Sequence, residues 1–184
     1  TTSGIETSTV IFATQGTGDK TFALSGASSG FTLTSGVNQA TLRVLATANP
    51  DTYNLTVTAT DAVGATTALP ITVVVSPPPV ILGTARIELT RGVAITSPIF
   101  NLSGGTGTRN VSLVTSPTNA NISLSGTTSS GTFLLVSESS TAGTFLSTIR
   151  VTDARGSFSE LVVTVIVNAP VTLSGSLSIT KTYG

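Results

Sequence analysis

The chain offers few side chains for acid–base, nucleophilic or metal chemistry. Its 184 residues contain no His and no Cys, and only eight acidic and eight basic residues. The usual pairs of nucleophile and base, and zinc sites built from Cys and His, are therefore excluded. The acidic residues are scattered and show no pairing of the kind that glycoside hydrolysis needs. We expect no catalytic residue, no cofactor and no enzyme activity.

Two of the acidic residues occur in matching contexts. Asp61 lies three residues before Gly64, and Asp153 lies three residues before Gly156, both in the pattern Thr-Asp-Ala-x-Gly. Aspartate at such a position accepts hydrogen bonds from the backbone amides of a turn, and glycine adopts the left-handed conformation that turns require. We interpret both motifs as hairpin turns. We assign no metal to them, because calcium takes six to eight oxygen ligands, several of them carboxylates.

The composition narrows the class of partner and the setting. Only 9% of the residues are charged and the net charge is zero, so the basic surface that nucleic acid or an anionic membrane attracts is missing. The longest apolar runs, 71–75 and 161–167, are too short for membrane insertion. About a third of the chain is Thr (36) or Ser (24), yet 39% is hydrophobic, which is enough for a folded core. The lack of Cys and Met favours an extracellular, cell-surface location.

The sequence repeats itself with a period of about 90 residues. The Thr-Asp-Ala-x-Gly motif recurs after 92 residues, as does the apolar run 71–75, which returns as 163–167. The turn motif at 16–18 returns as 105–107 after 89 residues. Such internal similarity marks a chain built from copies of one structural unit. We conclude that the chain holds two copies of one module.

Each module is predicted to consist of short strands. Apolar residues alternate with polar ones over 53–59 and again over 145–151, which is the period of a half-buried strand. Glycine- and serine-rich turns separate such runs, and no helical period persists. Short strands at this spacing favour an all-β fold of two tandem antiparallel β-sandwiches.

The final third of each module resembles a known family. The resemblance is to the last hairpin of bacterial cadherin-like and immunoglobulin-like repeats of surface adhesins and extracellular filaments, and it rests on the run 69–75 and on Tyr53-x-Leu55-x-Val57-x-Ala59-x-Asp61-x-x-Gly64. It implies that Tyr53 is a tyrosine-corner residue, whose hydroxyl bonds the backbone, whereas the second copy has Phe145. Family members build stalks and often bind calcium between domains. The linkers at 76–79 and 168–170 contain no acidic residue, so we expect proline to stiffen them instead.

The two copies are cut at different points of the repeat. The second module has a predicted first strand at about 80–91, which the first module lacks, since Thr1 aligns near Val93. The segment 171–184 aligns with 79–92 and so repeats that strand. We predict an incomplete sandwich at 1–78, a complete sandwich at 79–170 and a C-terminal donor strand at 171–184.

The C-terminal segment has the alternation of a strand that buries one face. Its even positions from 172 to 182 are all Ser or Thr. We predict that its apolar side chains fill a groove in the first module of another copy, and that glycine allows close backbone approach there; the residues are Val171, Leu173, Gly175, Leu177 and Ile179. Such copies would polymerise head to tail by donor-strand complementation, as the structural subunit of an extracellular filament. The alternatives are two repeats of one giant adhesin stalk or a carbohydrate-binding accessory module.

The sequence leaves the other contacts of such a fibre open. A surface glycan or a receptor on a neighbouring cell is conceivable, but no motif identifies either. Sequons for N-glycosylation occur at four positions, which we take as candidate modification sites: Asn54, Asn101, Asn110 and Asn121.

Overall fold

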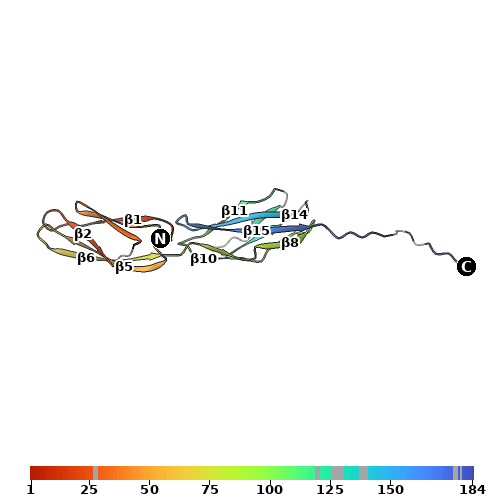
Figure 1. The fold of residues 1–184 in the computed structure, drawn as a ribbon, viewed down its shortest axis with the longest axis horizontal. Helices are drawn as coiled ribbons and strands as arrows, with labels where there is room; N and C mark the ends of the chain where they lie inside the picture. Colours follow the sequence, from red (N-terminus) through yellow and green to blue (C-terminus); the bar gives the residue numbers. More distant parts are fainter. Residues whose placement is uncertain (27–28, 119–120, 126–130, 137–140, 176–177, 179) are drawn as a thin grey trace.

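The computed structural model is built entirely from strands, turns and extended segments in the part of the chain that it describes. The structure describes residues 1–26, 29–118, 121–125, 131–136, 141–175, 178 and 180–184. The strands form two sandwiches placed end to end, followed by an extended tail (Figure 1). Among the residues that the structure describes, there is no helix long and apolar enough to cross a membrane. The predicted all-β fold of two tandem sandwiches is confirmed.

The first module packs two three-stranded sheets against each other. One sheet has the order β1-β4-β3 and the other the order β2-β5-β6, with antiparallel pairing throughout. The long hairpin of β5 and β6 carries the alternating run that the sequence predicted. The strands are β1 (Thr7–Phe12), β2 (Thr21–Ser25), β3 (Phe31–Gly36), β4 (Gln39–Val44), β5 (Asp51–Thr60) and β6 (Thr66–Val75).

The second module repeats this arrangement with additional strands. Its sheets have the orders β12-β13-β10-β7, where β9 also pairs with β13, and β11-β14-β15-β8. The pairing is antiparallel except between β15 and β8, which run parallel. The strands are β7 (Val80–Leu82), β8 (Arg86–Thr90), β9 (Ile95–Thr96), β10 (Phe100–Ser103), β11 (Asn110–Thr115), β12 (Ile122–Ser125), β13 (Gly131–Val136), β14 (Gly143–Thr152) and β15 (Phe158–Asn168).

The predicted first strand of the second module is two strands in different sheets. Residues 80–82 form β7, which pairs with β10, and residues 86–90 form β8, which pairs with β15. The chain crosses between the sheets at Gly83, where an added Cβ would lie 2.4 Å from the ring of Phe100. Only glycine lets the backbone pass this close to a buried aromatic ring, so the crossing is built into the sequence.

The alignment of the N-terminus with the second module also differs from the prediction. Ser3 N donates to Ser76 O just as Arg91 N donates to Asn168 O, and Gly4 (φ 85°) corresponds to Gly92 (φ 82°). Thr1 therefore matches Leu89 rather than Val93. The sequence comparison missed this because the repeat spacing, which is 92 at the final hairpin, is 88 at this end.

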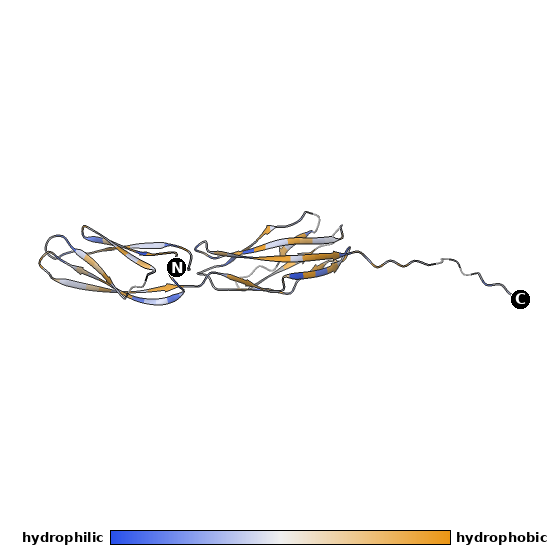
Figure 2. Ribbon diagram, in the orientation of Figure 1, coloured by the Kyte–Doolittle hydropathy of each residue, from blue (hydrophilic) through white to orange (hydrophobic). Residues whose placement is uncertain are grey.

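The two modules differ in how completely their cores are covered. The core of the second module is a large cluster of buried side chains that includes Phe100, Ile149 and Val165, all 0% exposed. The core of the first module is smaller and is formed around Phe31, Leu42 and Leu55. Figure 2 shows apolar residues along the strands of both modules. The tail follows β15 and leaves the second module at the end away from the linker (Figure 1).

Candidate functional site

The first module has one side on which both of its sheets end. Its edge strands there are β1 and β6, and their counterparts in the second module are β10 and β15. In the second module β7 is added beside β10, and β8 is added beside β15. The first module has no strand at either place among its described residues. We call this side, between β1 and β6, the open side.

The core-facing residues of β6 are more exposed than the equivalent residues of β15 in the second module. Ile71 and Val73 are half-buried, whereas their counterparts in β15, Val163 and Val165, are each 0% exposed. The β6 residues have nearly the same side chains, so the difference comes from the strands that lie over β15. Strands added beside β1 and β6 would therefore remove apolar surface of the first module from water. Such burial stabilises a protein by about 25 cal/mol for each Å² of apolar surface.

Two hollows follow one another along the open side. One, of about 250 Å³, is lined by residues of β1, β4 and β6, among them Leu42, Val44 and Val73. The other, of about 280 Å³, is lined by Ile11, Phe22 and further residues at the opposite end of β1 and β6. Strand-sized hollows of this kind, with amide edges on both walls, suit an added strand whose alternate side chains point inward.

The repeat register shows which tail residues correspond to the strands over the second core. With the 92-residue spacing, Leu173 corresponds to Ile81, which is 7% exposed, and Gly175 corresponds to Gly83. Leu173 itself is 100% exposed and Val171 is 92% exposed. A Cβ added to Gly175 would meet no atom within 4 Å. The predicted residues Leu177 and Ile179 lie outside the described residues.

The two modules meet at a hydrogen-bonded junction that the sequence did not predict. Thr2, which is 0% exposed, donates its hydroxyl proton to Oδ2 of Asp153 over 2.5 Å. The hydroxyl oxygens of Thr2 and Thr106 lie 2.7 Å apart. Gly105 N donates to the carbonyl of Pro77 in the linker. The junction is thus polar, buried and tied to the linker.

A recurring motif could have pointed to this junction. The pattern x-Thr-x-Gly occurs six times in the chain, and at three of these places, 1–4, 89–92 and 181–184, the threonines Thr2, Thr90 and Thr182 hold the same place in the repeat. Four residues of low complexity carry little weight in a chain so rich in threonine. The structure gives the pattern meaning, because Ile5 N donates to Thr2 O as Val93 N donates to Thr90 O.

Asp153 shapes its turn and also serves the junction. Its carboxylate accepts from Arg155 N and Ser157 N within the hairpin, from Thr106 N and from Thr2. Burial acts to raise the pKa of Asp153, but the hydrogen bonds from Thr2 and the three amides outweigh it and hold the pKa below its ordinary value of 3.8. The carboxylate is therefore charged at neutral pH.

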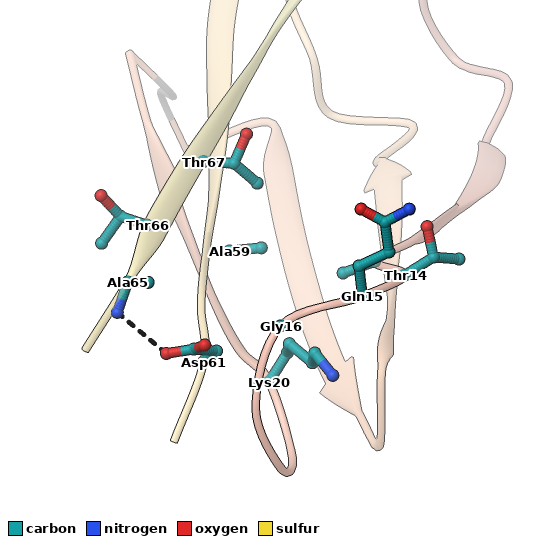
Figure 3. Close-up of a pocket in the computed structure, with 10 residues that line it drawn as sticks. Thr14, Gln15, Gly16, Lys20, Ala59, Asp61, Ala65, Thr66 and Thr67 are labelled. Atoms are coloured by element: carbon teal, nitrogen blue, oxygen red, sulfur yellow. Dashed lines mark hydrogen bonds between the residues drawn. The ribbon is translucent and has the colours of Figure 1, made fainter. Parts of the chain in front are cut away.

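Asp61 forms the corresponding turn at the far end of the first module, where Figure 3 shows it beside a hollow of about 310 Å³. Its carboxylate accepts from Thr17 N, Val63 N and Ala65 N. The bond from Thr17 N is the largest of the effects that lower the pKa of Asp61 from 3.8. Gly64 and Gly156 follow with φ of 91° and 88°, the conformation that favours glycine. The two turns share their geometry.

The remaining predicted residues lie at the surface or at a corner. Tyr53 donates its hydroxyl to Asn49 O over 3.0 Å and packs edge-on against Phe31, which is the arrangement of a tyrosine corner. The four sequon asparagines are all exposed: Asn54, Asn101, Asn110 and Asn121. Within the described residues, no three acidic side chains gather as a metal site would need.

Comparison with solved structures identifies the fold. The chain is similar to an I-band fragment of titin, I67–I69, with a TM-score of 0.60 at 16% sequence identity, covering 92% of this chain and 62% of that fragment. It also matches domains Ig1 and Ig2 of DIP-gamma (TM-score 0.49, 10% identity, 91% and 92% covered) and extracellular cadherin domains 1–4 of protocadherin gamma B7 (TM-score 0.47, 16% identity, 92% and 48% covered). No family model and no curated protein matches the chain. The match to titin shows that both modules have an immunoglobulin-like fold.

Proposed function

We propose that the chain is the structural unit of an extracellular fibre, in which the tail (171–184) of one copy completes the first module of the next copy. One observation carries the proposal: among the described residues the open side has no strand in the places of β7 and β8, and the tail matches those two strands in the register of the repeat. The tail and the open side are thus complementary parts of one module. The extracellular setting rests on the composition, which lacks Cys and Met and is rich in Ser and Thr.

The direction of the strands supports a head-to-tail assembly. β8 runs parallel to β15, so a tail that takes the place of β8 runs parallel to β6. It then enters the open side at the Asp61 end of the first module and ends beside Thr1. The tail leaves the second module at the end away from the first module (Figure 1). Asp61 lies in the turn between β5 and β6, at the end of the first module away from the linker, since β6 ends at Val75 just before the linker. A contact between different ends of identical copies repeats from copy to copy, and it gives an open filament when the rotation between copies does not close a ring.

The register assigns the contacts of the inserted tail. In the second module Asn101 pairs with Leu82, and the equivalent pair in the assembly is Phe12 with Ser174 of the tail. Likewise, the pair of Thr164 with Arg86 corresponds to Thr72 with Ser178 of the tail. Leu173 enters the hollow near Ile11, and Gly175 crosses between the sheets as Gly83 does over Phe100. The insertion ends at Thr180, because Thr1 and Ser3 already hydrogen-bond the end of β6.

A second candidate is a covalent stalk in which the tail begins the next module of the same polypeptide. It is favoured by the recurrence of x-Thr-x-Gly at 1–4, 89–92 and 181–184, because residues 181–184 and 1–4 hold the same place in the repeat. Both candidates join the tail to the open side of a following module. They differ in whether separate copies associate.

The decisive experiment compares the full chain with a variant that lacks 171–184. We expect the full chain to form filaments in electron micrographs, and the shortened chain to stay monomeric. A peptide of residues 171–180 should bind the shortened chain and raise the melting temperature of its first module. The same peptide with Leu173→Asp is the matched control and should not bind, because a charge would enter an apolar hollow.

Two results would decide against the filament. Filaments of unchanged spacing formed by the shortened chain would contradict the role of the tail. A full chain that stays monomeric at all concentrations, while the peptide still binds the shortened chain, would favour the covalent stalk. In that case, joining Gly184 to Ile5 of a second copy should yield a rigid rod of four modules in which the third module is as stable as the second.

A further inference from the structure

We infer that the Asp61 end of the first module is a docking surface for a second copy of this chain, and that Thr90 of that copy donates its hydroxyl proton to Asp61. The inference rests on the proposed function for its partner and adds a contact to it. The junction inside the chain is its template, because there the equivalent residues, Thr2 and Asp153, are joined by a hydrogen bond.

The Asp61 turn and the loop before it form the same hydrogen bonds as the Asp153 turn and its loop. Ala62 N donates to Thr17 O as Ala154 N donates to Thr106 O, so the turn and the loop before it are held together in the same way. Thr17 N donates to Asp61 as Thr106 N donates to Asp153. The Asp61 carboxylate accepts hydrogen bonds from the equivalent backbone amides. In the described part of the chain, no hydroxyl group donates to it as that of Thr2 donates to Asp153.

The Asp153 turn and the Asp61 turn differ in how exposed their residues are. Asp153 is 4% exposed and Thr106 is half-buried, because the first module covers them. Asp61 is half-buried and Thr17 is exposed. The hollow beside Asp61 includes Gly16, whose counterpart Gly105 lies against Pro79 of the linker. Val171 corresponds to Pro79 in the repeat. In the assembly, Val171 of the second copy would therefore cover Gly16 as Pro79 covers Gly105.

Thr90 is placed in the second module as Thr2 is placed in the first. Thr90 pairs in parallel with Asn168 at the end of β15, and Thr2 pairs in parallel with Ser76 just after β6. A left-handed glycine follows each threonine two residues later. Thr2 is buried by the module that follows it, whereas Thr90 is exposed at the end from which the tail leaves. Insertion of the tail into a second copy brings this end of the second module against Asp61 of that copy.

One difference between the two junctions lies where the linker approaches the loop before the turn. Gly104 is left-handed, and a Cβ there would lie 2.3 Å from the carbonyl oxygen of Pro78. Its counterpart in the first module is Gln15, also left-handed with φ of 64°. The Cβ of Gln15 requires the linker carbonyl of the docking copy, that of Pro170, to lie further away. The intermolecular junction is thus a looser version of the internal one.

Cysteine pairs test the inference, since the natural chain contains no Cys. The Thr17→Cys, Thr90→Cys variant of the full chain should form intermolecular disulfides on mild oxidation and give a ladder of covalent multimers in denaturing gels. The matched control is Thr2→Cys with Thr106→Cys, whose hydroxyls lie 2.7 Å apart and which should form a disulfide within one chain. Thr17→Cys with Thr84→Cys should give no ladder, because exposed Thr84 lies away from the end of the module.

A third pair, Thr72→Cys with Ser178→Cys, reports insertion of the tail separately. If this pair crosslinks and the Thr17, Thr90 pair gives no more multimers than the Thr84 control, the inference is wrong while the proposed function stands. If the Thr17, Thr90 pair alone crosslinks, the docking surface is supported and strand insertion is contradicted. If neither crosslinks while the Thr2, Thr106 control does, both are wrong.

Discussion

Thr2 and Asp153 are separated by 151 residues and are joined by a hydrogen bond of 2.5 Å at the junction of the two modules. Both are almost completely buried, and the hydroxyl meets a carboxylate that three backbone amides already hold in place. A charge-assisted bond of this kind is short and stronger than one between neutral groups. Together with the bond from Gly105 N to the carbonyl of Pro77, it ties the linker region to the hairpin turn of the second module.

Replacing Thr2 by Val should destabilise the junction. The substitution keeps the shape of the side chain and removes the hydroxyl, so that a buried carboxylate loses one partner. We expect a loss of about 1–3 kcal/mol in the free energy of unfolding, measured by urea denaturation of the full chain below its assembly concentration. Thr90→Val is the matched control, since Thr90 is exposed, and should change the same quantity by less than about 0.5 kcal/mol. Equal effects of the two variants would contradict this account.

The stability of the second module should fall in acid. The pKa of Asp153 is lower in the folded chain than its ordinary value, so the unfolded chain binds more protons as the pH falls. Its contribution is complete above about pH 4 and is lost as the pH falls through the lower pKa of the folded state. Thermal unfolding between pH 7 and pH 2 measures this. Asp153→Asn should flatten the dependence, and an equally steep decline in that variant would contradict the assignment.

The two equivalent glycines should respond differently to alanine. Gly83→Ala places a Cβ 2.4 Å from the Phe100 ring and should destabilise the second module in every state, by about 1–3 kcal/mol. Gly175→Ala meets no atom in the isolated chain, so the stability of the monomer should not change. It should, however, raise the concentration needed for filament formation, which sedimentation measures. Ser174→Ala is the control, because its counterpart Leu82 is 59% exposed and faces solvent. Equal assembly of the Gly175→Ala and Ser174→Ala variants would count against insertion of the tail.

Replacing Gln15 by Gly should strengthen association. Glycine removes the Cβ that separates the two copies, and it also relieves the left-handed strain at this residue by about 1 kcal/mol. Gln15→Ala keeps the Cβ and serves as the control. We expect the Gln15→Gly variant to crosslink through the Thr17, Thr90 cysteine pair at a lower concentration than the Gln15→Ala variant. If the two variants crosslink alike, the linker of the docking copy does not approach residue 15.

Much of the fold followed from local patterns in the sequence. Alternation in 53–59 and 145–151 predicted the long strands β5 and β14, because side chains in a strand point to opposite faces in turn. The repeated Thr-Asp-Ala-x-Gly motif predicted two equivalent turns, because the hydrogen bonds within each hairpin, from Ala65 N to Asp61 and from Ser157 N to Asp153, join residues only four apart. The repeat indicated a gap before Thr1, and among its described residues the first module has no counterpart of β7 or of the first part of β8. The role of the tail as its replacement stays a prediction.

The tertiary structure decided what depends on distant residues. Alternation cannot show that 80–91 divides between two sheets, since that depends on the ring of Phe100 packing beside Gly83. The match of Thr1 with Leu89 became clear only from hydrogen bonds to the end of β6, because the repeat changes length between its turns. Asp153 reads as a turn residue in the sequence, and only the packing of one module on the next brings Thr2 to it. Local spacing determines a strand or a turn, whereas a junction depends on which surfaces the folded chain brings together.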